Sequence, residues 1–598
     1  MLLTRTKIVC TIGPSVASYE KIFALMQAGM NVARLNFAHG TLEEHKLTVQ
    51  NLKKARAELN LPLAIMIDIK GPEIRVGTLP NGSLSLAPKQ QLKLVSIEKK
   101  SAPGEIPMRP IQALESVAVG MKVLFDDGNI ISHVVEIGDQ SAVIEIENGG
   151  LLKSGKGINI PAARLHLPAV TPKDIVDLKF GCENDIDLVA ASFIRSAHNI
   201  LSIKEILAQE GKSNILVIAK IENNHGIENF DSIVQAADGI MIARGDLGVE
   251  LDLARVPQLQ KMMIRKCFQA CKPSITATQM LESMITNIRP TRAEVSDVAN
   301  AIYDGTSAIM LSGETAMGKY PVEAVQCMSS IAKETESDFN YRLFFEQHSE
   351  RDYHDLASAV ALASVKTAYS ANAKAIFAFT HTGRTARFVS RFRPEMPIVA
   401  VTASEKVYHQ LASNWGVIPV LSPDCRNAKQ AFAAASSYAL SQGIISFGDV
   451  VVVMAGTPFG KQGSTNMMVV ESIGNVLVRG HKGFGSKVRG KVSFLFSPEG
   501  RDSESLEGKI VVISHCDSSF LPSLKRASGV ILQNYIGDTS SEKYAALIAK
   551  TFEIPVMYRA DGAMTVLQED EEVTLDPQRG LVYKGEEAPS CLVFSFDG

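Results

Sequence analysis

The chain has 598 residues, of which 46% are hydrophobic and 21% are charged, and its formal net charge is −3. A chain of this length allows about three to five domains, each with a core of its own. The near balance of charge gives no bulk attraction to nucleic acid or to a membrane surface, and no apolar run reaches the ~20 residues of a membrane-spanning helix.

The start of the chain and its cysteines both favour a cytoplasmic location. The first residues lead straight into a strand pattern at Lys7–Thr11, without the regions of a signal peptide. The 8 cysteines are scattered. Only Cys267 and Cys271 are close, at helical spacing and without His or Cys partners for zinc. We expect buried apolar thiols rather than metal ligands or disulfides.

Short β-rich apolar runs alternate with helical patterns in the first part of the chain. The runs are Lys7–Thr11, Val32–Leu35, Ala64–Ile67, Asp187–Ala191, Ile215–Ala219, Gly239–Ala243, Ser274–Ala277 and Ser307–Leu311. Such alternation implies parallel strands joined by right-handed crossovers. About eight units over roughly 250 barrel residues predict a closed (β/α)8 barrel rather than an open sheet.

Residues Glu73–Leu165 interrupt this alternation. They carry turn signals such as Pro80-Asn81-Gly82 and Asp126-Asp127-Gly128 between short alternating strands such as Ala142–Glu147. The pattern predicts a small all-β domain inserted after the third barrel strand. From that position it could swing over the mouth of the barrel as a lid.

A second α/β unit is expected beyond the barrel. After a helix around Pro321–Phe339, the strongly polar segment Glu346–Asp355 is interpreted as a linker, and a helix over about Leu356–Tyr369 follows it. The strands of this unit are expected at Ala375–Thr380, Ile398–Thr402 and Val450–Met454.

The first of these strands leads into Thr380-His381-Thr382-Gly383-Arg384-Thr385, just before a helix. Hydroxyls, a glycine and an arginine at a helix start form a natural phosphate cradle. A helix-capping loop is the alternative explanation of the same residues. Asp449 and the loop Gly456–Gly463, with Lys461, are candidates for the facing wall.

The composition changes again from Gly474. Leu477–Ser486 is basic and rich in glycine, and the β-rich runs after it predict a fourth, compact domain. The predicted division is 1–72 with 166–343 for the barrel, 73–165 for the lid, 344–475 for the second α/β unit and 476–598 for the fourth domain.

Two barrel strands end abruptly in charged residues. The run before Lys220 and Glu222 and the run before Asp246 are both apolar, and the two lie at strand–helix spacing. Residues just past parallel barrel strands converge on one mouth. Two carboxylates there suit a hard divalent cation, and an ammonium beside it could hold an anionic substrate or a developing oxyanion. A structural ion pair is the alternative.

Several longer stretches occur in a specific order along the chain. They are Lys7–Pro14, Asn31–Phe37, Asp68–Arg75, Lys220–Asn223, Ala243–Gly248, Ala277–Met284, Arg289–Glu294, Ser296–Ala301 and Met310–Thr315. Together they resemble pyruvate kinase along nearly all of residues 3–475. The A, inserted B and C domains of that family also match the division expected from patterning.

The resemblance implies a phosphotransferase that moves the phosphoryl group of phosphoenolpyruvate to ADP in glycolysis, giving pyruvate and ATP. Such transfer depends mostly on positioning and charge neutralisation. By this resemblance, Glu222 and Asp246 hold Mg²⁺ or Mn²⁺. Lys220 faces the transferring phosphoryl group and the enolate oxygen, and Arg34 neutralises phosphate.

The resemblance also implies roles around the substrate and the nucleotide. Thr278, with ordered water and Ser296, belongs to the path that protonates the enolate; a Thr hydroxyl is a weak acid and fits a relay. The substrate carboxylate is expected on the backbone of Ala243, Arg244, Gly245 and Asp246. The nucleotide and its second metal are expected to meet His39, Arg75 and, from the lid, Asp127 and Lys156. Arg75 fits a structural ion pair equally well.

The monovalent-cation site of the family is only partly retained. That site uses side-chain oxygens of an Asn, a Ser and an Asp, and a Thr carbonyl. Here Asn36 and Asp68 are present, whereas Ala38 stands at the Ser position and Ile69 at the Thr position. The Ile69 carbonyl remains available, and water could replace the lost hydroxyl. Since Glu73, which accompanies potassium dependence in the family, is retained, we expect weak-affinity K⁺ activation.

The tail has a recognisable layout as well. Ile510–Ser514, Ala545-Ala546, Glu553–Val556 and the closing Val573–Tyr583 resemble the swivelling phosphohistidine domain of phosphoenolpyruvate-utilising enzymes, an extra C-terminal domain in some bacterial pyruvate kinases. The phosphohistidine position falls on Tyr544, and tyrosine is not a competent carrier in that role. We therefore expect a structural, regulatory or assembly role for the tail.

The expected fold class is thus α/β: a (β/α)8 TIM barrel with an inserted all-β lid, a C-terminal α/β domain and an extra swivelling-type domain. The resemblance places a phosphorylated allosteric effector at Thr380, Thr382, Gly383, Arg384 and Thr385. It also implies a homotetramer in which the C domains form one interface, and such coupling would give sigmoidal kinetics.

Two other functions are the alternatives to this one. A lyase or aldolase on the same barrel would give no reason for the nucleotide-facing lid or for Lys220. A degenerate paralogue that senses metabolites is favoured by Ala38 and Tyr544. It is opposed by the retention of the residues that matter most: Arg34, Lys220, Glu222, Asp246 and Thr278.

Overall fold

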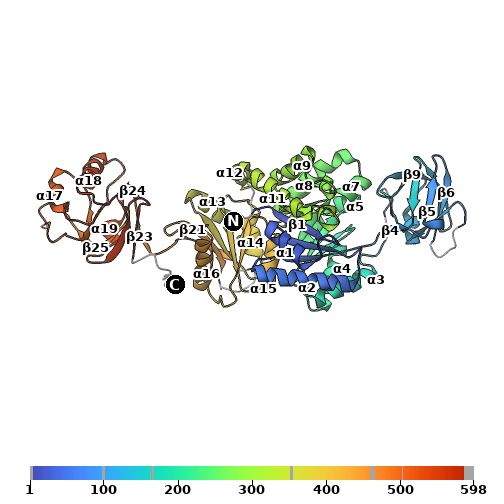
Figure 1. The fold of residues 1–598 in the computed structure, drawn as a ribbon, viewed down its shortest axis with the longest axis horizontal. Helices are drawn as coiled ribbons and strands as arrows, with labels where there is room; N and C mark the ends of the chain where they lie inside the picture. Colours follow the sequence, from blue (N-terminus) through green and yellow to red (C-terminus); the bar gives the residue numbers. More distant parts are fainter. Residues whose placement is uncertain are drawn as a thin grey trace. The chain divides into compact units, whose positions relative to one another are not determined.

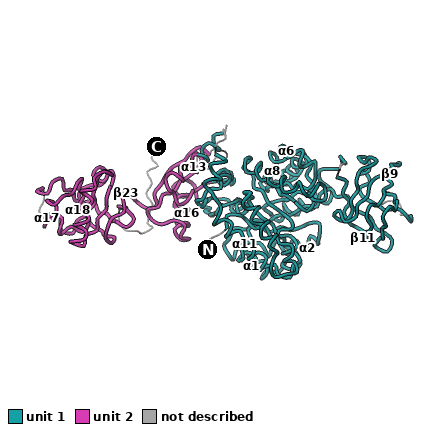
Figure 2. Tube along the Cα trace, turned by 90° about the horizontal axis from the view of Figure 1, so that it is seen from above, with its two compact units in different colours: residues 1–362, 380–423 teal, residues 363–379, 424–598 magenta. Residues whose placement is uncertain are grey.

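The structure is a computed structural model, and it describes residues 4–96, 102–161, 163–164, 167–349, 355–457, 463, 465–500 and 503–584. The chain divides into two compact units, coloured teal and magenta in Figure 2. The first comprises residues 1–362 and 380–423, and the second comprises residues 363–379 and 424–598. Within the ranges described, no helix has the length and apolar character needed to cross a membrane.

The first unit contains a closed barrel of parallel strands in the order β1-β17-β16-β15-β14-β13-β3-β2. These strands are β1 (Lys7–Ile12), β2 (Val32–Asn36), β3 (Ala64–Ile69), β13 (Leu188–Ala191), β14 (Leu216–Ile221), β15 (Gly239–Ala243), β16 (Ser274–Ala277) and β17 (Ala308–Leu311). The closed ring, with helices between successive strands (Figure 1), confirms the predicted (β/α)8 fold.

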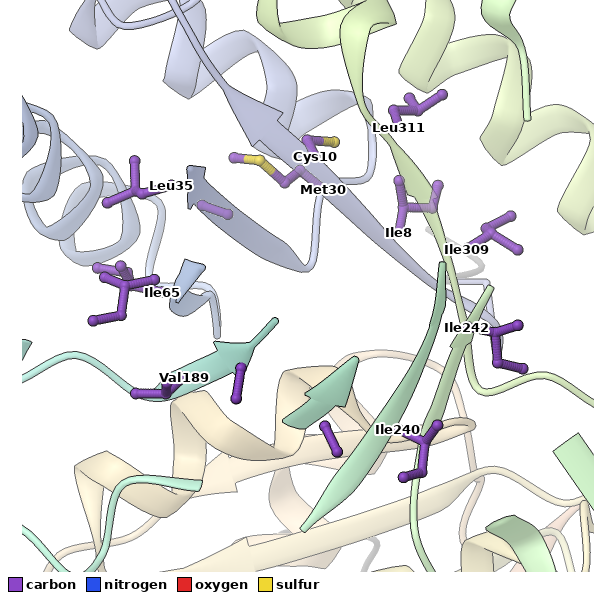
Figure 3. Close-up of a cluster of buried hydrophobic side chains, with 14 of the residues drawn as sticks. Ile8, Cys10, Met30, Leu35, Ile65, Val189, Ile240, Ile242, Ile309 and Leu311 are labelled. Carbon is purple, nitrogen blue, oxygen red and sulfur yellow. The ribbon is translucent and has the colours of Figure 1, made fainter. Parts of the chain in front are cut away.

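Alternate residues of the barrel strands enter two separate cores. Val9, Met66 and Met310 pack with one another and with small residues of neighbouring strands inside the ring. Their neighbours along the chain, such as Ile8 and Ile309, face outward and pack with buried helix residues. Figure 3 shows side chains of this outer layer. Because successive side chains alternate between these two cores, both faces of each strand are buried, and both are apolar in the sequence.

Helices cover the outside of the barrel. The main ones are α1 (Tyr19–Ala28), α2 (Leu42–Leu59), α3 (Pro172–Glu183), α4 (Ala197–Gln209), α6 (Phe230–Ala236), α8 (Val256–Gln269), α9 (Arg292–Tyr303) and α11 (Pro321–Asp338). Capping boxes start α2, α3 and α9, where they are formed by Thr41 with Glu44, Thr171 with Asp174, and Thr291 with Glu294. Such boxes satisfy the free N–H groups of the first turn and fix where these helices start.

The insertion after β3 is an all-β domain, as expected. Seven strands close into a second barrel in the order β10-β6-β7-β4-β12-β8-β9, and β11 pairs with β5 beside it. The strands are β4 (Ile74–Val76), β5 (Ser83–Leu86), β6 (Gln91–Ser96), β7 (Glu105–Arg109), β8 (Lys122–Phe125), β9 (Ile130–Gly138), β10 (Ser141–Ile146), β11 (Gly150–Lys153) and β12 (Gly157–Asn159). Its own buried core includes Leu94, Val123 and Ile144. We call this domain the lid.

The segment after α11 differs from the sequence-based prediction. Residues 346–349, expected in a linker, form the last turn of α12 (Tyr341–Ser349). The His348 ring stacks on Phe344 at 4.2 Å and meets Phe268 edge-on at 4.6 Å. Aromatic contacts on one face of the helix therefore outweigh the polarity of its sequence.

The α/β region that follows contributes elements to both compact units. In the first unit, α14 (Arg384–Ser390) precedes the parallel pair β19 (Ile398–Thr402) and β20 (Val417–Leu421), with α15 (Glu405–Gln410) between those strands. In the second unit, β18 (Ala375–Phe379) pairs parallel with β21 (Val450–Gly456), which pairs antiparallel with β22 (Thr465–Ser472). The remaining helices are α13 (Leu356–Ser370) and α16 (Ala428–Ser441).

The tail forms a mixed sheet in the order β23-β30-β29-β25-β26-β27-β28-β24. Its elements are β23 (Val476–Arg479), β24 (His481–Phe484), β25 (Val488–Phe494), β26 (Lys509–Ile513), α17 (Leu521–Leu524), β27 (Gly529–Leu532), α18 (Thr539–Phe552), β28 (Val556–Tyr558), α19 (Ala563–Val566), β29 (Glu572–Asp576) and β30 (Leu581–Lys584). The strands β23 and β24 lie at opposite edges of the sheet, although only Gly480 separates them in the sequence. A Cβ atom at Gly480 would lie 2.6 Å from the Tyr558 carbonyl oxygen, which explains the glycine.

Candidate active site at the mouth of the barrel

Lys220 lies near the carboxyl end of β14, and its ammonium group has three close partners. Its Nζ atom is 2.6 Å from Ser192 Oγ, 2.9 Å from Glu222 Oε1 and 3.2 Å from Asp68 Oδ1. Burial alone would lower the pKa of Lys220, but the carboxylates of Asp68 and Glu222 outweigh burial and raise that pKa. Lys220 is therefore a permanently charged cation in a fixed position.

Asp68, on β3, holds a second cation. The Arg34 Nε atom, on the neighbouring strand β2, donates to Asp68 Oδ2 at 2.7 Å, and Arg34 Nη1 donates to Thr11 Oγ1 at 2.9 Å. Burial would raise the pKa of Asp68, yet Arg34 and Lys220 together lower it. One buried carboxylate thus aligns two cations at the same end of the barrel, an arrangement that suits an anionic substrate.

Two further carboxyl groups lie beside Lys220. Glu222 follows β14, and Asp246 lies in the first turn of α7 (Arg244–Glu250), directly after β15. Burial and the nearby charge of Glu222 raise the pKa of Asp246 above its usual range, because two carboxylates placed close together cannot both ionise easily. Paired carboxyl groups of this kind offer hard oxygen ligands for a divalent cation.

The rest of a metal shell would have to come from water or substrate. Across the described ranges, no group of three or more His, Cys, Asp or Glu side chains is arranged to hold a metal ion. Mg²⁺ commonly binds through one or two carboxylates and keeps several waters. The Glu222–Asp246 pair fits that pattern in number and in donor type.

Thr278 follows β16 in a strained backbone conformation. Its φ is +69°, in the left-handed region that β-branched residues disfavour, and Gln279 after it has φ of +54°. The Thr278 Oγ1 atom donates to the Ala277 carbonyl at 2.6 Å and accepts the Gly245 N–H at 2.8 Å. The strain therefore places this hydroxyl against the start of α7, and such strain is concentrated at functional sites.

The Arg244 side chain has a structural role in this arrangement. Its guanidinium forms an ion pair with Asp297 at 2.7 Å and donates to the Thr278 carbonyl at 2.7 Å. Ser296, on α9, is exposed and precedes the Asp297 that binds Arg244. The contacts described for Ser296 do not join its hydroxyl to Thr278.

The residues expected to bind potassium lie on neighbouring strands. Asn36 at the end of β2 is directly opposite Asp68 of β3, and Ile69 follows Asp68. The Asn36 Oδ1 atom accepts the Ala38 N–H at 3.1 Å. The Asn36 side chain, the Asp68 side chain and the Ile69 carbonyl all offer oxygen atoms, which is the type of ligand that K⁺ binds. Ala38 contributes no hydroxyl.

The residues expected to meet the nucleotide are divided between the barrel and the lid. His39 is exposed after β2, and its carbonyl contacts His45 Nε2 at 2.8 Å. Arg75 forms an ion pair with Glu73 at 2.5 Å and donates to the Gly155 carbonyl at 2.8 Å. The structural ion pair that the sequence left open for Arg75 is present.

On the lid, Lys156 and Asp127 lie on two adjacent loops, which are joined by a hydrogen bond of 3.2 Å from the Asp126 N–H to the Gly157 carbonyl. The Lys156 ammonium is 2.6 Å from Asp126 Oδ1, and a hydrogen bond from Lys156 to Asp126 raises the pKa of Lys156. Asp127 is exposed, with φ of +54°. Asp127 also contributes to the raised pKa of Asp246.

The expected effector residues lie in one loop and in the first turn of the short helix α14 that follows it. They are Thr380, Thr382, Gly383, Arg384 and Thr385. Gly383 has φ of +78°, and the exposed Arg384 guanidinium lies 5.1 Å from the Phe388 ring centroid. Lys461, proposed for the facing wall, lies outside the residues that the structure describes.

Two other sequence-based candidates have definite surroundings. Asp449 Oδ1 is 3.4 Å from Arg579 Nη2 of the tail. The residue proposed for the wall facing the effector loop therefore forms an ion pair with the tail. Tyr544 lies on α18 and is exposed. The neighbouring Glu542 forms an ion pair with Arg559 at 2.6 Å.

Sequence reasoning missed Ser192 and Thr11. Ser192 is buried directly after β13, and it bridges Lys220 and Asp68; Thr11, on β1, receives a hydrogen bond from Arg34. The signal that could have found Ser192 is its position just after a barrel strand, the same position that singled out Glu222. A lone serine carries no charge, so it gives no distinct signal in the sequence.

Fold and site together define a class of protein. A (β/α)8 barrel that gathers two buried cations and a pair of carboxyl groups at the carboxyl ends of its strands is a barrel enzyme acting on anionic substrates. Comparison with known proteins makes this specific. A model of the pyruvate kinase barrel domain matches residues 3–325, and one of the pyruvate kinase alpha/beta domain matches residues 358–471. The mobile domain of PEP-utilising enzymes matches residues 506–580.

Individual relatives agree with these matches. A pyruvate kinase of Geobacillus stearothermophilus is 41% identical over 584 residues, which cover 97% of this chain and 99% of the relative. One of Bacillus licheniformis is 41% identical over 586 residues, covering 98% and 99%. The crystal structure of a pyruvate kinase from Cryptosporidium parvum superposes with a TM-score of 0.75 at 37% identity, covering 78% of this chain and 96% of that one. The chain therefore belongs to the pyruvate kinase family, and it is a transferase with the extra C-terminal domain.

Proposed function

We propose that this enzyme transfers the phosphoryl group of phosphoenolpyruvate to ADP at the mouth of its barrel, giving pyruvate and ATP. The observation that carries the proposal is the position of Lys220, which is fixed by Asp68 and Glu222 beside Asp246. Phosphoryl transfer needs cations that meet the phosphoryl oxygens without rearrangement. Lys220 and Arg34 satisfy that need, and we assign them the phosphoryl group and the enolate oxygen.

Glu222 and Asp246 would hold Mg²⁺ or Mn²⁺, since their carboxyl groups are adjacent and are hard donors. A bound divalent cation supplies charge neutralisation at the phosphoryl group and at the enolate. The substrate carboxylate would lie on the backbone from Ala243 to Asp246, where the Gly245 N–H now donates to Thr278.

Thr278 would relay a proton to the enolate carbon, with ordered water and Ser296 completing the path. The nucleotide would bind between His39 of the barrel and the lid residues Arg75, Asp127 and Lys156. These roles follow from the positions of the motifs in the family. The short hydrogen bonds of the Thr278 hydroxyl support its proposed role as a proton relay.

Further properties are proposed from the family resemblance. K⁺ would bind Asn36, Asp68 and the Ile69 carbonyl with weak affinity, because Ala38 lacks the hydroxyl of the family site. A phosphorylated effector would bind the loop 380–385. We propose a cytoplasmic homotetramer, with domains at 1–72 with 166–343, 73–165, 344–475 and 476–598.

The test is ATP formation from phosphoenolpyruvate and ADP with Mg²⁺, in a K⁺ titration against Na⁺. We expect turnover that K⁺ stimulates. Activity that does not depend on K⁺ would contradict the proposed potassium site and still support the proposed enzyme. If no ATP forms with any cation, the alternative of a metabolite sensor would be favoured. In the same assay Lys220→Met should abolish phosphoryl transfer while metal-dependent enolisation of pyruvate stays measurable. Near-normal transfer in that variant would remove the role assigned to Lys220.

A further inference from the structure

The lid touches the barrel at the end of the helix that carries Asp246. Asn159, the last residue of lid strand β12, donates through Nδ2 to Glu250 Oε1 at 2.8 Å. Glu250 is the last residue of α7. At the neighbouring lid turn, a Cβ atom on Gly128 would lie 3.7 Å from Val249 Cγ1. Two points of the lid thus meet the last two residues of α7.

The two ends of α7 are held by different domains. At its start, Arg244 forms an ion pair with Asp297 and the Gly245 N–H donates to Thr278, so the first turn is attached to the barrel. At its end, the Glu250 side chain is attached to the lid through Asn159. Because α7 has only 7 residues, Glu250 lies about one helical turn from Asp246.

The electrostatic surroundings agree with this geometry. Burial raises the pKa of Glu250, and the hydrogen bond from Asn159 acts in the opposite direction. A partly buried carboxyl group without its amide donor would face a desolvation penalty.

We propose that the Asn159–Glu250 hydrogen bond is a latch that couples the position of the lid to the placement of Asp246. Both are positioning residues that act through α7. The latch rests on the proposed function, in which Asp246 binds the divalent cation and the lid meets the nucleotide. Since coupling between two sites is reciprocal, a latched lid favours cation binding, and a bound cation favours the latched lid.

The test uses the full chain and Mn²⁺ as the probe, with free Mn²⁺ measured by electron paramagnetic resonance at pH 8. Asn159→Asp places a second carboxylate against Glu250 and should open the latch. We expect the Mn²⁺ dissociation constant to rise about fivefold or more, the size of a typical coupling between sites, and the KM for ADP to rise with it.

Two variants make the result specific. The double variant Asn159→Asp/Glu250→Gln exchanges donor and acceptor across the contact, and it should restore Mn²⁺ affinity. Gln140→Glu adds the same charge at an exposed lid turn and should leave Mn²⁺ affinity unchanged. A contact that merely stabilises the fold would lower the thermal midpoint in Asn159→Asp without changing Mn²⁺ affinity.

The outcomes separate the latch from the function beneath it. If the unaltered chain binds Mn²⁺ and makes ATP, but Asn159→Asp binds Mn²⁺ equally well, the latch is wrong and the proposed function stands. If the double variant fails to recover affinity, the direct Asn159–Glu250 contact is not the coupling element, and the latch is again wrong. An unaltered chain that binds no Mn²⁺ would overturn the metal site and the latch with it.

Discussion

The Ser192 hydroxyl accepts a hydrogen bond of 2.6 Å from the Lys220 ammonium and lies 3.1 Å from Asp68 Oδ1, to which it donates. It is the only neutral side chain among the close partners described for Lys220, so it fixes the direction of the cation without adding charge. Ser192→Ala should therefore lower kcat about tenfold or more, since hydrogen bonds to charged groups contribute about 1.5–3 kcal/mol.

Steady-state kinetics with phosphoenolpyruvate and ADP would measure this effect, with little change expected in the KM for phosphoenolpyruvate. Ser202→Ala, at a half-buried position on α4 where the hydroxyl donates to the His198 carbonyl at 3.0 Å, is the matched control and should behave like the unaltered enzyme. An unchanged kcat in Ser192→Ala would mean that Asp68 and Glu222 suffice to orient Lys220.

Thr278 offers a test of the proton relay. Thr278→Val keeps the shape of the side chain and removes the hydroxyl, whereas Thr278→Ser keeps the hydroxyl. Because positioned proton-transfer groups contribute about 10²–10⁴-fold, we expect Thr278→Val to lose at least about a hundredfold in the exchange of pyruvate methyl protons with solvent. NMR measures that exchange directly. Equal losses in both variants would point to the strained backbone at φ +69° rather than to the hydroxyl.

His409 makes the stability of the first unit sensitive to acid. It is buried on α15, where Nδ1 accepts the Leu63 N–H at 3.3 Å. Burial and the nearby cations Arg56 and Lys406 lower its pKa to about 3, from the ordinary value of 6.5 for histidine. The neutral ring therefore contributes stability that is fully present above pH 6.5 and is lost as the pH falls towards 3, about 2 kcal/mol of it by pH 5.

His409→Asn keeps an acceptor for the Leu63 N–H and removes the titration. We expect its thermal midpoint to fall less between pH 7 and pH 5 than that of the unaltered chain. His198→Asn, at an exposed position on α4, serves as the control. A parallel fall in all three proteins would show that His409 does not determine the acid sensitivity.

The tail can be removed at a boundary that the structure supplies. Its first strand begins at Val476, and its described contacts with the preceding domain include Arg479 with Gly448 and Arg579 with Asp449. Because the barrel and lid have cores of their own, a chain ending at Gly474 should keep most of its kcat. The milder Arg579→Ala variant breaks only the Asp449 contact and should match the unaltered enzyme. A truncated chain that folds but does not turn over would assign the tail a role in catalysis.

Local pattern was enough to predict the barrel and the lid. The apolar strands have both faces buried, so they read as continuous hydrophobic runs, and the lid strands alternate between turn signals. The paired charges after β14 and β15 also followed from position, since parallel strand ends meet at one mouth. These features depend on neighbours in sequence or on a regular fold, and both are visible in a single chain.

Other features depend on contacts that sequence spacing does not reveal. The α12 turn at residues 346–349 is stabilised by Phe268, from another helix, so its polar sequence misled the linker prediction. Asp449 pairs with Arg579 from a different domain. The left-handed conformation of Thr278 is imposed by its surroundings against the preference of the residue. Tertiary context decided each of these.

The strand pairing of the tail also has a consequence for its synthesis. Val476 of β23 is paired with Tyr583 of β30, so the first strand of this domain cannot pair until its last strand has been synthesised. The barrel has the same dependence at an earlier point, because Lys7 is paired with Ala308. On the ribosome the barrel can close once Leu311 has emerged, whereas the tail stays open until Lys584 has been made. A nascent chain stalled between these two points carries unpaired strand edges, which are prone to aggregate and would attract chaperones.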